Sequence, residues 1–260
     1  MTMMLSRIVG KYRRTLAYRL NSRMASIKTA VPIISFTFDD APKTAFDEGG
    51  AILGSHGAKA TFFVSLGLLG SRTEVGTIAS REDLLRSSEE GNELGCHTFD
   101  HLYTWETTPD MFVESVMRNK EALDRILPGA KFRSFAYPIG VPKPSVKLKL
   151  EKHFLCCRGG GQTANTGVAD LNLLKSFFID KRNNEDIDAI KRIIDYNASR
   201  PGWLIFATHD VTETPSPYGC TPKFFLNVVE YAARSGALLL PVIDAFERLR
   251  LSGAEPGGLQ

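Results

Sequence analysis

The feature that most constrains the fold is an alternation of short apolar runs with longer helical patterns along residues 31–250. Runs with the length and composition of buried strands lie at 33–38, 60–65, 93–97, 132–137, 154–158, 173–179, 204–208 and 237–240. Between several of them, apolar residues recur at helical spacing, as in 108–127, 183–200 and 221–236. Repeated strand–helix units favour parallel strands joined by crossover helices. We therefore predict an α/β fold, a distorted (β/α) barrel of seven to eight parallel strands, in one domain spanning 31–250.

Composition agrees with one globular domain: 43% of the 260 residues are hydrophobic and 23% are charged. The four cysteines, Cys96, Cys156, Cys157 and Cys220, show no C-x-x-C spacing, which indicates reduced and mostly buried thiols. No run approaches about twenty apolar residues, so no transmembrane helix is expected. The N-terminus lacks the apolar core and cleavage site of a secretory signal. These features favour a cytoplasmic protein.

The charge is unevenly distributed along the chain. Residues 1–38 hold seven basic residues and no acidic one, whereas the remainder holds 25 basic and 29 acidic residues. Apolar residues at helical spacing within 5–24 predict that residues 1–30 form a basic amphipathic arm. One interpretation is contact of residues 1–28 with the inner face of an anionic membrane; the other, slightly favoured, is packing on the domain or on a second subunit of an oligomer. No nucleic-acid partner is expected, because the basic character ends with the arm. The tail at 251–260 is expected to be flexible.

Polar residues gather where the predicted strands end. Asp39 and Asp40 follow the first strand, His97 closes the third with His101 four residues on, and His209 follows the strand at 204–208. The strand at 132–137 is likewise followed by Pro138 and Gly140. In an α/β barrel the carboxyl ends of the strands form the active-site face.

The segment HTFDH at 97–101 places two histidines at i and i+4, the spacing of a metal-binding pair on a helical turn. A carboxylate from the first strand is the natural third ligand. Two imidazoles and one carboxylate around Zn²⁺ leave a position for water, as in hydrolytic sites. Of Asp39 and Asp40, one is then expected to bind the metal and the other to act in acid–base chemistry.

The segments TFDD (37–40), HTFDH (97–101), RSFAYPIG (133–140) and FATHD (206–210) resemble the successive motifs of the polysaccharide deacetylases, the NodB-like enzymes of carbohydrate esterase family four. The resemblance covers about residues 31–248 and implies metal-dependent removal of an acetyl group from an N-acetylated sugar. It implies that Asp40, His97 and His101 bind Zn²⁺, or another divalent ion such as Co²⁺ or Ni²⁺. It also implies that Asp39 is the general base and His209 the general acid.

Other positions follow from the same comparison. Arg133 is the candidate for the arginine that pairs with the base, and a backbone N–H near Tyr137, Ile139 and Gly140 is the candidate oxyanion donor. The region that carries the family's fourth motif has no tryptophan. Asp180, its only acid that could orient His209, is interpreted as a solvated loop residue. The glycine-rich segment 158–167 is expected to form a loop near the substrate.

Several alternatives stay open at this point. The same site suits a deformylase or a cyclic amide hydrolase, and the substrate is either a glycan or a lipid-linked or nucleotide-linked sugar. A non-catalytic carbohydrate-binding protein would be expected to have lost one of Asp39, Asp40, His97, His101 and His209. A structural metal site would need a fourth protein ligand.

Overall fold

The computed structural model describes residues 2–183 and 185–251. The predicted tail therefore lies, apart from residue 251, outside the described residues.

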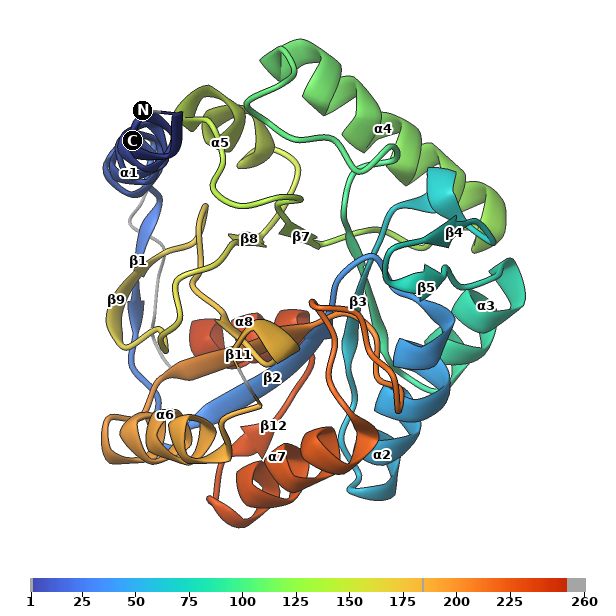
Figure 1. The fold of residues 1–260 in the computed structure, drawn as a ribbon, viewed down its shortest axis with the longest axis vertical. Coiled ribbons are helices and arrows are strands. Elements are labelled where there is room, and N and C mark those ends of the chain that lie inside the picture. Colours follow the sequence, from blue (N-terminus) through green and yellow to red (C-terminus); the bar gives the residue numbers. More distant parts are fainter. Residues whose placement is uncertain (1, 184, 252–260) are drawn as a thin grey trace.

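All eight predicted strands are present in one sheet, and every pairing within it is parallel. They are β2 (Ile33–Phe38), β3 (Thr61–Val64), β6 (Glu93–Cys96), β7 (Ser134–Ala136), β8 (Cys156–Arg158), β10 (Phe177–Phe178), β11 (Trp203–Thr208) and β12 (Leu238–Leu239). The order is β10-β11-β2-β3-β6-β7-β8, and β12 also pairs with β2. A single parallel bridge between Arg158 and Leu174 links β8 to the segment that leads into β10, so the sheet curls toward closure (Figure 1). The predicted distorted (β/α) barrel is confirmed.

Helices surround the sheet (Figure 1). They are α2 (Ala51–Ser55), α3 (Arg81–Glu89), α4 (Pro109–Ile126), α5 (Pro144–Leu150), α6 (Ile187–Ser199), α7 (Pro222–Arg234) and α8 (Val242–Leu251). The patterns at 108–127, 183–200 and 221–236 become α4, α6 and α7. Thr108 and Thr221 each cap a helix by accepting a hydrogen bond from a backbone N–H three residues on, and a proline follows each of them. Every residue of β2 and β11 is buried, as expected for parallel strands covered on both faces.

Two antiparallel pairs lie outside this sheet. β1 (Met24–Ile27) pairs with β9 (Gly167–Asp170), and β4 (Arg72–Thr73) pairs with β5 (Gly76–Thr77). Sequence patterns did not predict them, because strands of two to four residues carry too little periodicity to be seen. All four cysteines are free and buried, as predicted.

The helix α1 (Thr2–Arg19) is joined to the body by its C-terminal turns. The buried ammonium of Lys147, on α5, donates to the carbonyl oxygens of Ala17 at 2.6 Å and Leu20 at 2.9 Å and pairs with Asp170 at 2.7 Å. These bonds satisfy carbonyl groups that a helix C-terminus leaves without an intrahelical partner. Within the described residues, no helix is long and apolar enough to cross a membrane.

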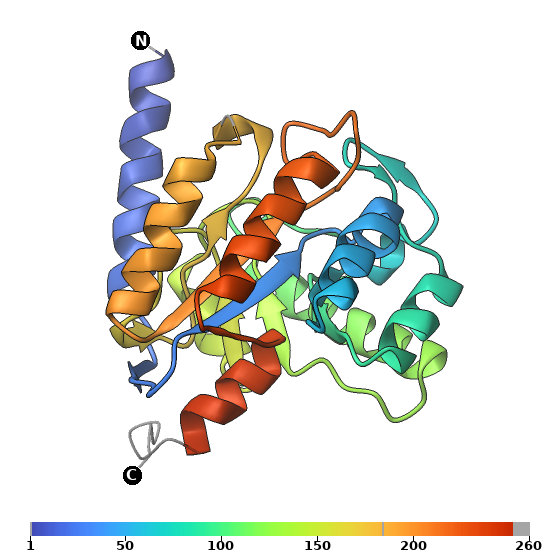
Figure 2. The ribbon, with the colours of Figure 1, turned by 90° about the horizontal axis from the view of Figure 1, so that it is seen from below.

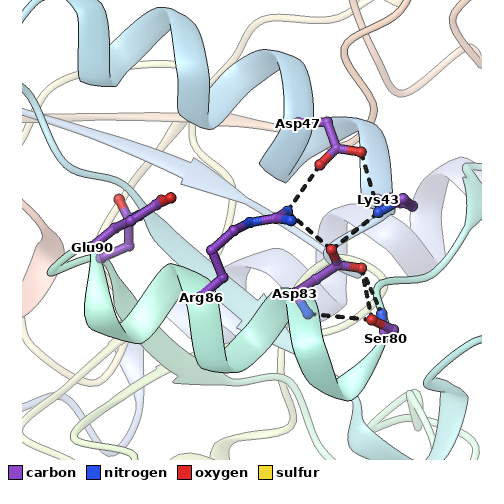
Figure 3. Close-up of polar contacts among 7 residues, drawn as sticks. Lys43, Asp47, Ser80, Asp83, Arg86 and Glu90 are labelled. Atoms are coloured by element: carbon purple, nitrogen blue, oxygen red, sulfur yellow. Dashed lines mark hydrogen bonds and ion pairs between the residues drawn. The ribbon is translucent and has the colours of Figure 1, made fainter.

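A polar network fixes the segment that follows β2 (Figure 3). Asp83, nearly buried at the start of α3, forms a capping box with Ser80 and accepts hydrogen bonds from Lys43 at 3.0 Å and Arg86 at 2.9 Å. Asp47, in the π-helical turn Ala45–Gly50, contacts the same two cations at 3.3 and 2.9 Å. The network ties α3 to the chain just beyond Asp39 and Asp40.

Candidate active site

A cavity of about 820 Å³ opens at the carboxyl end of the parallel strands. Its lining includes every residue for which the sequence predicted a role except Arg133: Asp39, Asp40, His97, His101, Tyr137, Ile139, Gly140 and His209. Gly159, Gly160, Gly161 and Gln162 also line it, so the glycine-rich segment lies at the cavity as predicted.

The backbone after β2 turns both adjacent aspartates toward the cavity. The Asp39 N–H donates to the Thr208 carbonyl at 2.9 Å, which continues the pairing of β2 with β11 by one residue. Asp40 and Ala41 then take left-handed conformations, with φ of 59° and 53°. Such conformations are unfavourable for residues with a Cβ, by about 1–2 kcal/mol each. Here they bring the two neighbouring carboxylates to one cavity. In an extended strand, successive side chains would point to opposite faces.

Asp40, His97 and His101 come together as a potential metal site. One ligand atom from each lies within 4.8 Å of the other two. Asp40 Oδ1 is 3.1 Å from His101 Nε2 and 3.5 Å from His97 Nε2, and it is buried without a hydrogen bond to any described residue. A buried carboxylate oxygen of this kind needs a cation. The two-nitrogen, one-oxygen set suits Zn²⁺ or a similar divalent ion, so these residues fit the metal.

The two histidines converge through a loop and not through the helical turn that their spacing suggested. Residues 97–101 form no helix, and Thr98 and His101 have φ of 63° and 53°. His97 Nδ1 donates to the Ala136 carbonyl at 2.8 Å, which leaves Nε2 free to bind a metal.

The electrostatics keep His97 and Asp40 in metal-binding form, whereas they favour the protonated form of His101. Burial lowers the pKa of His97 to about 4, so its ring is neutral at neutral pH. Burial alone would raise the pKa of Asp40, but the nearby imidazoles of His101, His97 and His209 outweigh it and hold that pKa below its usual range. For His101, burial works against protonation, but the contact with Asp40 prevails and raises the pKa.

Arg158, and not Arg133, is the partner of Asp39. The buried guanidinium of Arg158 donates to Asp39 Oδ1 and packs over the ring of Phe63 at 4.9 Å. Arg133 instead forms an exposed ion pair with Glu247. The prediction for Arg133 is therefore wrong: Arg133 lies just before β7, whereas Arg158 ends β8 on the cavity side. Arg158 is the last residue of the predicted strand 154–158. The expectation that polar residues at the carboxyl ends of strands face the active site therefore applied to Arg158 too.

His209 is oriented by Tyr218. Its Nδ1 lies 3.2 Å from the Tyr218 carbonyl oxygen, which can only accept, so Nδ1 carries a proton. The Tyr218 ring lies 5.5 Å from the imidazole, and Arg182 packs over the tyrosine at 4.8 Å.

Among the described residues, neither Asp180 nor the adjacent Asp210 forms a hydrogen bond with His209. Asp210 accepts from the backbone and side chain of Ser216 and so holds the loop that carries Tyr218. Asp180 is fully buried and pairs with Arg182, which corrects its interpretation as a solvated loop residue. The pairing of Asp180 with Arg182 places that cation over Tyr218.

Existing hydrogen bonds exclude some of the candidate oxyanion donors. The Tyr137 N–H already donates to the Arg158 carbonyl at 3.0 Å, and Pro138 has no N–H. Ile139 and Gly140 have φ of 50° and 83°, and neither N–H donates to another described residue. The Tyr137 N–H is therefore occupied, and the free backbone donors among the described residues of this segment are those of Ile139 and Gly140.

Comparison with known proteins agrees with this fold. The family model "Polysaccharide deacetylase" matches residues 26–154. No curated protein matches the chain. The peptidoglycan deacetylase PdaC from Bacillus subtilis is 18% identical with a TM-score of 0.59, over 87% of this chain and 96% of that one.

Two further solved structures are similar. The carbohydrate esterase family four domain of a multidomain xylanase from the hindgut metagenome of Trinervitermes trinervoides is 19% identical with a TM-score of 0.58, over 88% of this chain and 94% of that one. A family four acetyl xylan esterase from Clostridium thermocellum, in complex with a cobalt ion, is 21% identical with a TM-score of 0.59, over 86% and 93%. At these identities the structures show the shared fold. Together with the family match, they confirm the resemblance seen in the motifs: the chain belongs to the polysaccharide deacetylase family.

Proposed function

We propose that the protein is a zinc-dependent hydrolase that removes an N-acetyl group from an amino sugar. The observation that carries the proposal is the placement, around one cavity, of the Asp40–His97–His101 cluster, the Asp39–Arg158 pair and His209. Cobalt in the Clostridium thermocellum esterase supports a divalent metal in this fold. The described residues of the cluster offer three ligands, which favours a catalytic over a closed structural site.

The chain's own groups supply the proton transfers. A divalent ion held by Asp40, His97 and His101 would polarise the acyl oxygen and lower the pKa of a water. Asp39 accepts the proton of the water that attacks the amide carbon, and Arg158 holds that carboxylate in place and balances its charge. His209 delivers a proton from Nε2 to the departing sugar amine, a contribution of about 10²–10⁴-fold. The N–H of Ile139 or Gly140 donates to the oxygen that becomes negative in the transition state.

The test is acetate release by the zinc-loaded protein from a panel of N-acetylated sugars, free, oligomeric and lipid-linked. Asp39→Asn is expected to abolish release while zinc remains bound at one equivalent. Asp100→Asn is the matched control, because Asp100 belongs to the same motif but pairs with Arg118 and Ser115 outside the cavity lining. It is expected to retain activity.

Other outcomes separate the alternatives. Release of formate from N-formyl sugars, without acetate, would replace the deacetylase by a deformylase, and ring opening of a cyclic amide would indicate that class of hydrolase. Zinc bound with no hydrolysis of any substrate, and sugar binding retained, would favour a carbohydrate-binding protein.

A further inference from the structure

The helix α1 turns an apolar stripe away from the body. Ile8, Val9 and Tyr12 lie on one side of the helix and are 57%, 42% and 62% exposed. Contact with the body is made by other residues of α1. Arg13 packs over the Trp105 ring at 4.7 Å, Ala17 is fully buried, and the Tyr18 hydroxyl donates to the Gly160 carbonyl. Large apolar residues grouped on an exposed surface indicate an interaction site.

The same helix is basic throughout. Lys11, Arg14 and Arg19 are exposed, and none of them has an acidic partner among the residues that the structure describes. The first 38 residues contain no acid at all. A helix that combines an apolar stripe with unpaired cations is suited to the surface of an anionic bilayer, where the stripe enters the headgroup region and the cations meet lipid phosphates.

The position of α1 relates this surface to the cavity. Tyr18 contacts Gly160, which lines the cavity, and Arg13 donates to the hydroxyl of Tyr103, two residues after His101. The N-terminal end of α1 extends beyond the rest of the molecule on the side toward which β2 points (Figure 2). The helix therefore borders two loops of the site and projects on the side of the cavity.

We propose that α1 binds an anionic lipid bilayer and holds the cavity at its surface, where it would meet an acylated amino sugar carried by a membrane lipid. That the substrate is carried by a lipid rests on the function proposed above, whereas bilayer binding does not. A second copy of the chain is the less suitable occupant, because pairing two α1 helices would bring like charges together.

The test is co-sedimentation of the full chain with vesicles of equal parts phosphatidylglycerol and phosphatidylcholine. Wild type is expected to bind these vesicles and not vesicles of phosphatidylcholine alone. Lys11→Glu with Arg14→Glu should weaken binding by about 20-fold or more, since each basic residue near an anionic surface is worth about five-fold. Ile8→Ser with Tyr12→Ser should weaken it by about ten-fold or more through lost apolar burial.

Matched controls lie on other helices. Met111→Ser with Met117→Ser removes two exposed apolar residues from α4, and Arg192→Glu with Lys223→Glu reverses two exposed charges on α6 and α7. Both are expected to bind vesicles as wild type does. Absence of vesicle binding by wild type overturns the proposal. So does an oligomer in solution that Ile8→Ser with Tyr12→Ser dissociates, because a second copy would then cover the stripe.

Turnover of two kinds of substrate distinguishes membrane binding by α1 from the proposed hydrolase activity. With an N-acetylated sugar lipid embedded in the vesicles, the α1 variants should lose turnover, yet they should keep wild-type turnover of a water-soluble N-acetylated sugar. If the α1 variants turned over the lipid-embedded sugar as fast as wild type does, a lipid-carried substrate would be ruled out. If wild type binds the vesicles but hydrolyses neither substrate, the result would instead count against the proposed hydrolase.

Discussion

At the scale of single residues, the site separates two adjacent carboxylates by their partners. Asp39 is held by the buried cation of Arg158, whereas Asp40 faces two imidazoles and has an oxygen that no described group satisfies. Burial makes such partners obligatory, because an ionised carboxylate without a cation or hydrogen bonds is unstable away from water. These partners fit the proposed roles, Asp39 as the base and Asp40 as a metal ligand.

Arg158 is expected to matter to catalysis and Arg133 is not. Arg158→Gln should lower kcat by about 10²-fold or more, because the guanidinium holds the Asp39 carboxylate in position. Zinc stoichiometry should be unchanged. Arg133→Gln is the matched control and should leave kcat near that of wild type, since it breaks only an exposed ion pair. Steady-state kinetics on a sugar that the acetate-release panel identifies as substrate would decide, and equal effects of the two variants would contradict the assignment of Arg158.

At the scale of elements, a buried lysine holds the C-terminal end of α1 against the barrel. Lys147→Met removes the donor to the carbonyls of Ala17 and Leu20 and leaves Asp170 without its cation. The free energy of unfolding should fall by about 3 kcal/mol, as for other buried ion pairs that lose one partner. Urea denaturation measures this loss, and early proteolysis of α1 should accompany it. Lys149→Met, which removes an exposed neighbour on the same helix paired with Asp110, should cost little.

The network around Asp83 predicts a pH dependence of stability. Burial alone would raise the pKa of Asp83, but hydrogen bonds from Ser80 and the charge of Lys43 lower it below its ordinary value. The folded protein thus holds this proton less tightly than the unfolded chain. The stabilisation is complete above the unfolded pKa of about 3.9, and it is lost as the pH falls through the lower folded value.

Asp83→Ala should therefore cost about 1–2 kcal/mol at pH 7, chiefly through the lost capping box. The difference from wild type should shrink below about pH 4. Unfolding in urea at a series of pH values would measure this difference. Asp47→Ala is the control and should have a small effect, because Asp47 is more exposed. A difference that stayed constant down to low pH would show that the charge of Asp83 contributes nothing.

At the scale of the whole molecule, the cavity joins segments that are far apart in the chain. Its polar groups end β8 or follow β2, β6 and β11, and a metal bound there would bridge the Asp40 loop and the His97–His101 loop. A ligand that binds only the folded state stabilises it, by about 2.7 kcal/mol at a hundredfold excess over Kd.

Removal of metal should accordingly lower the melting temperature. Chelation followed by zinc addition should reverse the fall in wild type and in Asp39→Asn, but Asp40→Ala should show no shift, because it lacks a ligand. Differential scanning calorimetry would measure each case. A zinc-dependent shift that survives in Asp40→Ala would place the metal elsewhere.

The sequence by itself determined the class of fold and most of the candidate site. Eight apolar runs had the length and composition of buried strands, and each became a strand of the parallel sheet. Asp39, Asp40, His97, His101 and His209 stood out because strand ends in such a fold share one face, a consequence of chain direction that needs no coordinates.

The tertiary structure decided what depended on side chains meeting across strands. Which arginine reaches Asp39 is set by strand phase and by the curl of the sheet, and it is Arg158 and not Arg133. The burial of Asp180 depends on packing between distant segments. The support of His209 by Tyr218 arises because a loop folds back over the strand end. The outward turn of the apolar stripe of α1 follows from how Lys147 holds the C-terminal end of that helix and Trp105 contacts Arg13, which periodicity alone leaves undetermined.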